Sequence, residues 1–135
     1  ALGLKRNSPM KYLVSISLIL VGIIHLIPLS GVLSAEKLFS LYGILFDEPN
    51  LEILMRHRAV LFGILGGFMV LAAFKPAFQL AGLVAGFVSV ISFLCLSLAV
   101  GGYNEHIARV FWADIVALVL LVFGYIGYVV TQRRA

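Results

Sequence analysis

Residues 77–100 read AFQLAGLVAGFVSVISFLCLSLAV, a stretch without a single charged side chain. An α-helix rises about 1.5 Å per residue, so about 20 apolar residues cross the roughly 30 Å hydrocarbon layer of a bilayer. This stretch is therefore long enough to span a membrane. Working outward from it, three further apolar runs of similar length are found at residues 12–29, 53–74 and 107–130.

The composition of the whole chain favours the same class of protein. Of the 135 residues, 62% are hydrophobic and only 12% are charged, unlike a soluble globular domain. We predict an all-α polytopic membrane protein, a single integral membrane domain over residues 1–135 whose four transmembrane helices form an antiparallel four-helix bundle. A signal peptide is the alternative for the first run, but Leu33 makes VLSA (32–35) a poor cleavage site.

The connections between the runs differ in kind. The sequence KPA at 75–77 is so short that the runs on either side of it must form an antiparallel hairpin. Apolar residues recur at helix-like intervals in the segment 30–50, which predicts a short amphipathic helix on the outer membrane surface, followed by a turn at DEPN (47–50). A flexible loop is the alternative for this segment.

Lysine and arginine are distributed unevenly between the two ends of the predicted helices. The end with the termini carries Lys5, Arg6, Lys11, Lys75, Arg133 and Arg134, and the other end carries Lys37, Arg56, Arg58 and Arg109. The positive-inside rule then places both termini in the cytoplasm, and we expect a multi-pass protein of the bacterial inner (plasma) membrane in contact with the lipid bilayer. The basic residues cap apolar runs and form no stripe with exposed aromatics, so nucleic acid is not an expected partner.

Small residues mark the faces on which the helices are expected to pack. Helices associate in lipid through close packing and polar contacts, because lipid tails are as apolar as leucine. Two ladders of small residues recur at four-residue intervals, and we predict that they face each other in the hairpin: Ala59, Gly63 and Gly67 in one run, Gly82 and Gly86 in the next. The same pattern is compatible with a homo-oligomer.

Polar residues gather toward one end of the predicted bundle. The candidate ligand-binding or structural cluster is His25, Arg56, His57, Arg58, Tyr103, His106, Arg109 and Asp114. Asp114 is the most informative of them, because a carboxylate in the hydrocarbon zone is costly unless it is neutralised, paired or hydrated. Its candidate partners are Arg56, Arg58 or His25, and the cluster is read either as a structural ion pair or as a ligand or proton-handling site. Pro28 is expected to bend the first helix beside His25.

Several kinds of chemistry lack their signatures in this chain. Cys95 is the only cysteine, so disulfides and cysteine metal clusters are excluded. The three histidines stand on different segments without metal-ligand spacing, so no metal site is predicted. Phosphate-binding loops, dinucleotide fingerprints and nucleophilic triads are absent, and no cofactor is evident, although the histidines leave a haem or a quinone open.

Three stretches, HLIPLSGVL (25–33), LYGILFDEPNLEILMRHRAVLFG (41–63) and GGYNEHIARVFWADIVAL (101–118), resemble a group of small uncharacterised four-helix inner-membrane proteins of proteobacteria. Some members are labelled phosphopantetheine adenylyltransferase, a label that the residues do not support, because the (T/H)xGH signature of that enzyme is absent. More loosely, VGIIH (21–25) is similar to the GxxH element of DoxX-like membrane proteins, some of which are associated with quinone-linked redox enzymes. That resemblance implies a quinone-side or redox-partner role, in which His25 corresponds to the histidine of the GxxH element.

These observations leave three hypotheses. The favoured one is a pocket at the outer leaflet that binds a lipophilic or acidic small molecule, quinone-like or lipid-like, with arginines for an acidic or carbonyl-bearing head. The second is a non-catalytic accessory or assembly subunit of a larger membrane complex. The third, less favoured, is a proton-coupled carrier or membrane enzyme in which Asp114 and a histidine act as acid and base, with catalytic residues unknown.

Overall fold

The computed structural model describes the backbone of residues 2–134 and the side chains of residues 9–133, so the side chains of Lys5, Arg6 and Arg134 in the charge count lie outside the described residues. The four long helices are α1 (Leu2–Leu26), α3 (Pro49–Ala73), α4 (Gln79–Val100) and α5 (Glu105–Arg134). Three short segments connect them: η1 (Ile27–Val32), α2 (Ala35–Tyr42) and η2 (Pro76–Phe78). Four segments are long and apolar enough to cross a membrane, which confirms the predicted all-α membrane class.

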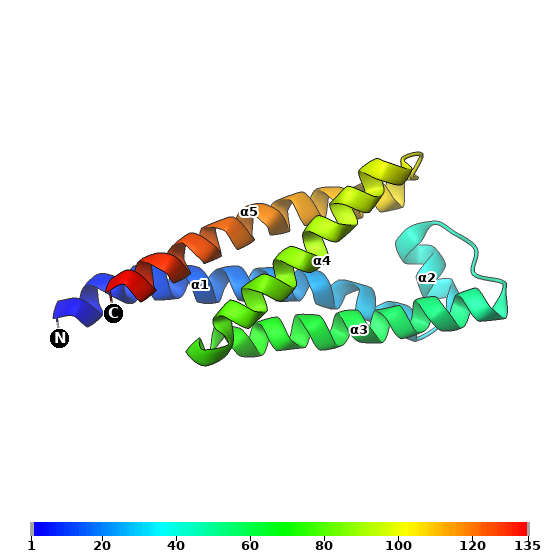
Figure 1. The fold of residues 1–135 in the computed structure, drawn as a ribbon. Coiled ribbons are helices and arrows are strands. Elements are labelled where there is room, and N and C mark those ends of the chain that lie inside the picture. The colour runs from blue at the N-terminus through cyan, green and yellow to red at the C-terminus, as the bar shows by residue number, and fades with distance from the viewer. Residues whose placement is uncertain (1, 135) are drawn as a thin grey trace.

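The long helices form an elongated bundle around α1. Figure 1 shows α1, α3 and α5 running along the long axis, while α4 crosses obliquely from the end of α3 to the start of α5. Both chain ends lie at the end of the bundle where α3 turns into α4, here called the terminal end. The short helix α2 lies at the opposite end, here called the α2 end, and confirms the amphipathic helix expected in the first connection.

The core lies where α1 meets the other three long helices. Leu18 in α1, Met69 in α3 and Leu83 in α4 are fully buried together with Leu121 in α5. Close approach at this point depends on glycine, because a Cβ built on Gly66 would stand 2.7 Å from the carbonyl oxygen of Gly22. Small residues therefore set the spacing of α1 and α3, as expected for helices that associate in lipid.

The predicted small-residue ladders do not pack as one pair of facing surfaces. Ala59 and Gly63 pack toward η1, since a Cβ on Gly63 would lie 2.6 Å from a methyl group of Leu29. Gly82 does meet α3, at Ala72, but Gly86 lies closest to Leu121 of α5. The reason is that α1 and η1 cover much of the face of α3 that the sequence predicts will pack on α4.

Gly67 is the member of the ladder that does not lie at a contact between helices. No neighbouring atom lies within 4 Å of a Cβ built on it, and its residue is exposed. The preceding glycine, Gly66, is buried at the contact with α1 instead. A four-residue spacing drifts around a helix of about 3.6 residues per turn, so a ladder read from sequence need not stay on one face.

Local capping determines where α2 and α3 begin and end. The Ser34 hydroxyl accepts a hydrogen bond from the Lys37 N–H at 3.2 Å, and Gly43 ends α2 at φ 67°, a left-handed conformation that suits glycine. The Glu48 carboxylate accepts hydrogen bonds from the backbone N–H groups of Asn50 and Leu51, which hold its pKa below the ordinary value of 4.5. Helix α3 therefore begins within the DEPN sequence, earlier than the predicted start at residue 53.

The first transmembrane segment changes character at its end and does not simply bend. Helix α1 ends at Leu26, and residues 27–32 continue as the 3-10 helix η1 with Pro28 near its start. Proline has no N–H to donate to the carbonyl of residue 24, so the α-helical pattern stops there. The tighter helix brings the buried Gly31 against Leu38 of α2.

The outward faces of the long helices are apolar. Large side chains such as Ile64, Leu71, Val88, Leu96 and Val116 are all more than half exposed. Hydrophobic surface on this scale is rare on soluble monomers but is what a lipid environment requires. The fold therefore defines a multi-pass membrane protein.

Candidate functional site

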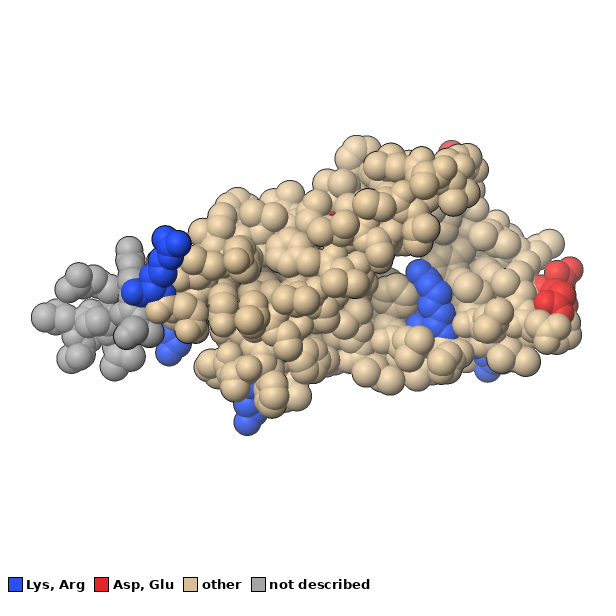
Figure 2. Space-filling view, in the orientation of Figure 1, with Lys and Arg blue, Asp and Glu red and all other residues tan. Residues whose placement is uncertain are grey.

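A cavity of about 310 Å³ lies between the helices toward the α2 end. Residues from α1, η1, α2, α3, α4 and α5 all contribute to its walls. Figure 2 shows the surface hollowed between the arm formed by α4 and α5 and the arm formed by α3, with basic surface beside the hollow. The polar lining residues are His25, Ser40, Tyr42, Arg58, Ser89, His106, Arg109 and Asp114.

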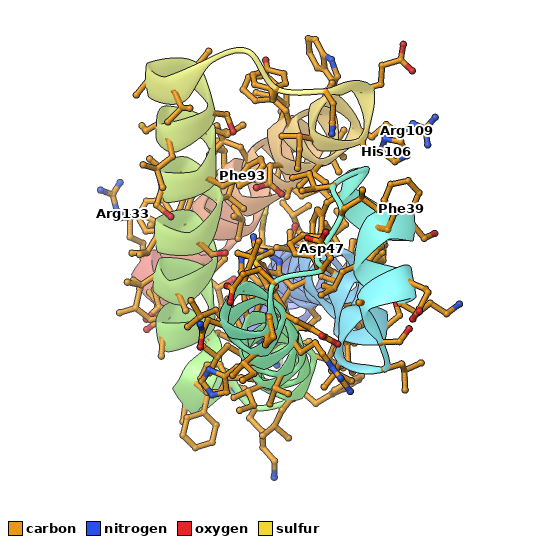
Figure 3. The ribbon with its side chains drawn as sticks, turned by 90° about the vertical axis from the view of Figure 1, so that its right-hand side faces the viewer. Phe39, Asp47, Phe93, His106, Arg109 and Arg133 are labelled. Atoms are coloured by element: carbon orange, nitrogen blue, oxygen red, sulfur yellow. The ribbon has the colours of Figure 1, made fainter. Side chains whose placement is uncertain are left out.

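The remaining walls of the cavity are apolar. Phe62 on α3, Phe93 on α4 and Val110 on α5 supply three of the apolar surfaces. Figure 3 looks at the molecule from the α2 end and shows Phe93 on the inner side of α4, with His106 and Arg109 beside α2. A concave apolar site with a few polar groups is the usual form of a small-molecule pocket.

Asp114 is the buried polar residue of this cavity that has no partner among the described residues. It is only 9% exposed, and it lies on α5 well inside the transmembrane segment. Among the described side chains, none forms a hydrogen bond or a salt bridge with its carboxyl group. Buried charges are normally paired, so this carboxyl group is a candidate for contact with a bound molecule.

The ion pair expected between Asp114 and an arginine is not formed. The salt bridge present among the described residues joins Arg56 to Glu52 at 3.3 Å, and Arg56 Nε also donates to the carbonyl of Val32 at 2.9 Å. Arg56 is therefore directed to the end of η1, away from the cavity. Arg58 lines the same cavity as Asp114 but is held by other groups.

Arg58 is fixed by an aromatic pair. Its Nη1 donates a hydrogen bond to the Tyr42 hydroxyl at 2.9 Å, and its guanidinium carbon lies 4.4 Å from the ring centroid of Phe62. Stacking on an aromatic face leaves the edge of the guanidinium fork available for other acceptors. The arrangement holds one positive charge at the cavity wall without neutralising it.

His25 is satisfied on both ring nitrogens. Nδ1 donates to the carbonyl oxygen of Val21 at 2.9 Å, because a carbonyl can only accept, and this assigns the proton of the neutral ring to Nδ1. Nε2 then accepts from the Ser89 hydroxyl, also at 2.9 Å. The residue is 3% exposed, and it joins α1 to α4 at the cavity wall.

Helix α2 closes one side of the cavity and is tied down at its C-terminal end. The Asn104 side chain donates to the carbonyl oxygen of Tyr42 at 2.8 Å and accepts from the N–H of Ile107 at 2.9 Å. Gly43 follows directly, and a Cβ there would lie 2.6 Å from the His106 ring. The end of α2 and the start of α5 are therefore packed together, which places Ser40 and Tyr42 at the cavity.

The structure divides the residues of the predicted cluster into two groups. The cavity walls bring together His25, Arg58, His106, Arg109 and Asp114. Arg56, His57 and Tyr103 do not line it: His57 is exposed, and Tyr103 stacks on Phe111 with ring centroids 5.9 Å apart. With His57 apart from His25 and His106, no group of three or more potential metal ligands forms among the described residues.

Several residues that line the cavity lie outside the cluster predicted from the sequence. Ser40 and Tyr42 come from α2, and Ser89 and Phe93 come from α4. Tyr42 could have been found, because it shares the apolar face of α2 with the buried Leu38. Ser89 had no such signal, since serine occurs on any face of a transmembrane helix.

Together these features define an all-α polytopic membrane protein with a mixed polar and apolar cavity between its helices at the α2 end. Comparison of the chain with protein-family models, with curated proteins and with solved structures finds no match. The function is therefore inferred from the cavity and from the residues that line it.

Proposed function

We propose that this protein binds an amphipathic small molecule, with an acidic or carbonyl-bearing head and an apolar body, in the cavity at the α2 end. The observation that carries the proposal is the Asp114 carboxyl group, which is nine-tenths buried, lines the cavity and has no partner among the described residues. A group retained at that energetic cost is a functional candidate by default.

The distribution of charge in the cavity suggests how such a head group would be held. Arg58 and Arg109 present donors suited to a carboxylate, phosphate or carbonyl oxygen. Asp114 suits a hydroxyl or amine hydrogen on the same head group, and Phe62 and Phe93 supply apolar surface for the body. Quinone-like and lipid-like molecules have this combination, and a DoxX-like relationship would favour the quinone.

The test is native mass spectrometry of gently extracted wild-type protein beside the Asp114→Asn and Arg58→Ala variants. We expect a small molecule to be retained by the wild type and to fall about tenfold or more in both variants, since each loses a charge-assisted hydrogen bond. Asp47→Asn, in the exposed loop before α3, is the matched control and should retain the molecule. Bare wild-type protein, or equal retention in Asp114→Asn, would contradict the proposal.

Stability separates this function from a purely structural role of Asp114. A carboxyl group that is buried without a partner destabilises the fold, so in protein freed of the bound molecule Asp114→Asn should leave the free energy of unfolding unchanged or raise it. A clear loss of stability would show that the carboxyl group holds the bundle together. A second polypeptide in the same spectra would favour the accessory-subunit alternative.

The proposed setting is the bacterial inner membrane with both termini in the cytoplasm. The support is that both chain ends lie at the terminal end, together with Lys11, Lys75 and Arg133. Under the positive-inside rule the cavity at the α2 end then opens toward the outer leaflet.

A further inference from the structure

The terminal end of the bundle differs in charge from the α2 end. Every acidic residue of the chain lies toward the α2 end: Glu36, Asp47, Glu48, Glu52, Glu105 and Asp114. On the face drawn in Figure 2, acidic surface appears only toward the α2 end, whereas basic surface appears at both ends. No carboxylate side chain therefore competes with an anion for the basic groups at the terminal end.

A second cavity of about 290 Å³ lies at this basic end, where α1, the end of α3, η2, the start of α4 and α5 meet. Its polar walls include Lys11, Tyr12, Gln79, Tyr128 and Gln132. Each of these side chains offers at least one hydrogen-bond donor, and no acidic residue lines the cavity.

Some donors of this cavity are already engaged, and others are available. The Ser15 hydroxyl donates to the carbonyl of Ala73 at 2.7 Å, and the Thr131 hydroxyl donates to the carbonyl of Gly127 at 2.8 Å. Among the described side chains, none accepts a hydrogen bond from Lys11 or from the hydroxyl groups of Tyr12 and Tyr128. Lys11, Tyr12 and Tyr128 therefore line one cavity with donor groups that have no partner among the described residues.

The position of the cavity favours the phosphate of a phospholipid over a soluble anion. The candidate transmembrane segments end here, at Pro9, Ala73, Pro76 and Arg133, which places the cavity at the expected boundary between hydrocarbon and headgroups. Exposed apolar surface adjoins it, because the Tyr12 and Phe74 side chains are each 67% exposed. A soluble anion would leave that apolar surface uncovered. A phospholipid has both a phosphate group for the donors and acyl chains for the apolar surface.

We infer that this terminal-end cavity binds the phosphate headgroup of an anionic phospholipid. Lys11 supplies the positive charge, and the hydroxyl groups of Tyr12 and Tyr128 supply hydrogen bonds to the phosphate oxygens. Basic pockets between transmembrane helices are a recurring form of lipid recognition. A zwitterionic lipid fits less well, because its ammonium group finds no carboxylate among the residues that line the cavity.

The inference is tested by adding phosphatidylglycerol or phosphatidylcholine to the delipidated full-length protein in detergent and counting bound lipid by native mass spectrometry. We expect phosphatidylglycerol to bind more tightly than phosphatidylcholine, and Lys11→Gln to weaken it about fivefold. Tyr128→Phe should also weaken the binding of phosphatidylglycerol, without a change in the charge of the cavity. Lys37→Gln is the matched control, because Lys37 is also exposed but lies on α2 at the opposite end.

Three results would overturn the inference. The first is equal affinity for the two lipids, and the second is an equal effect of Lys11→Gln and Lys37→Gln. The third is inorganic phosphate binding to the protein with the same dependence on Lys11 while phosphatidylglycerol does not bind, since the anion would then be a free one. Loss of the molecule bound at the α2 end in Asp114→Asn, with lipid binding intact, would show that the two sites are independent.

Discussion

At the scale of single residues, His25 shows how a polar side chain is accommodated inside a transmembrane helix. Its Nδ1–H returns to the carbonyl of Val21 in its own helix, and its Nε2 is paired with Ser89 on α4. Polar contacts of this kind join helices in lipid, where apolar surface alone does not. The buried ring therefore links two helices and forms part of the cavity wall at the same time.

Replacing Ser89 by alanine should destabilise the protein modestly. The change leaves Nε2 of the buried His25 without its partner, and interhelical hydrogen bonds in membranes contribute about 0.6 kcal/mol on average and about 1.7 kcal/mol at most. We expect a loss of about 0.5–1.5 kcal/mol in the free energy of unfolding, measured by denaturant titration in mixed micelles. Ser92→Ala is the control, because Ser92 is exposed and bonds only to the carbonyl of Ser89 in its own helix. Equal losses in the two variants would argue against this role of Ser89.

At the scale of helices, the contact between α1 and α3 depends on one pair of glycines. A Cβ on Gly66 would stand 2.7 Å from the Gly22 carbonyl oxygen, and a Cβ on Gly22 would stand 2.9 Å from the Gly66 carbonyl oxygen. Neither distance can be relieved by turning a side chain, because each atom met is backbone. The two helices would have to move apart to accept a methyl group.

Gly66→Ala should therefore lower the free energy of unfolding by about 1–3 kcal/mol, as overpacking in a close contact does. Gly67→Ala provides an internal comparison on the next residue of the same helix, where no atom lies within 4 Å of the added Cβ. We expect that variant to be neutral or slightly stabilising, because alanine is the better helix former. The same unfolding titration compares the two, and a Gly67→Ala variant as unstable as Gly66→Ala would contradict the packing described.

At the scale of the whole molecule, the segregation of charge predicts how the protein is inserted. Labelling of single-cysteine variants tests this, starting from a Cys95→Ala background, because Cys95 is the only native cysteine. In spheroplasts, a membrane-impermeant thiol reagent should label Lys37→Cys directly and Lys75→Cys only after lysis, since the basic terminal end is expected in the cytoplasm. The reverse pattern would invert the orientation, and equal labelling of both variants would indicate dual insertion.

The membrane class, the number of spanning helices and the amphipathic α2 were determined by the sequence itself. Each depends on local chemistry, because a helix that crosses hydrocarbon needs only length and apolar composition. The concentration of polar residues toward one end was also readable, and it led to His25, Arg58 and Asp114 at the cavity.

Only the tertiary structure decided which side chains share that cavity. In a soluble helix the apolar stripe shows which face is buried, but in lipid the outer face is as apolar as the inner one. The sequence therefore could not separate Arg58, which lines the cavity, from Arg56, which turns to η1 and Glu52. For the same reason Gly66, and not Gly67, became the contact with α1: the rotation of each helix about its axis is set by its neighbours.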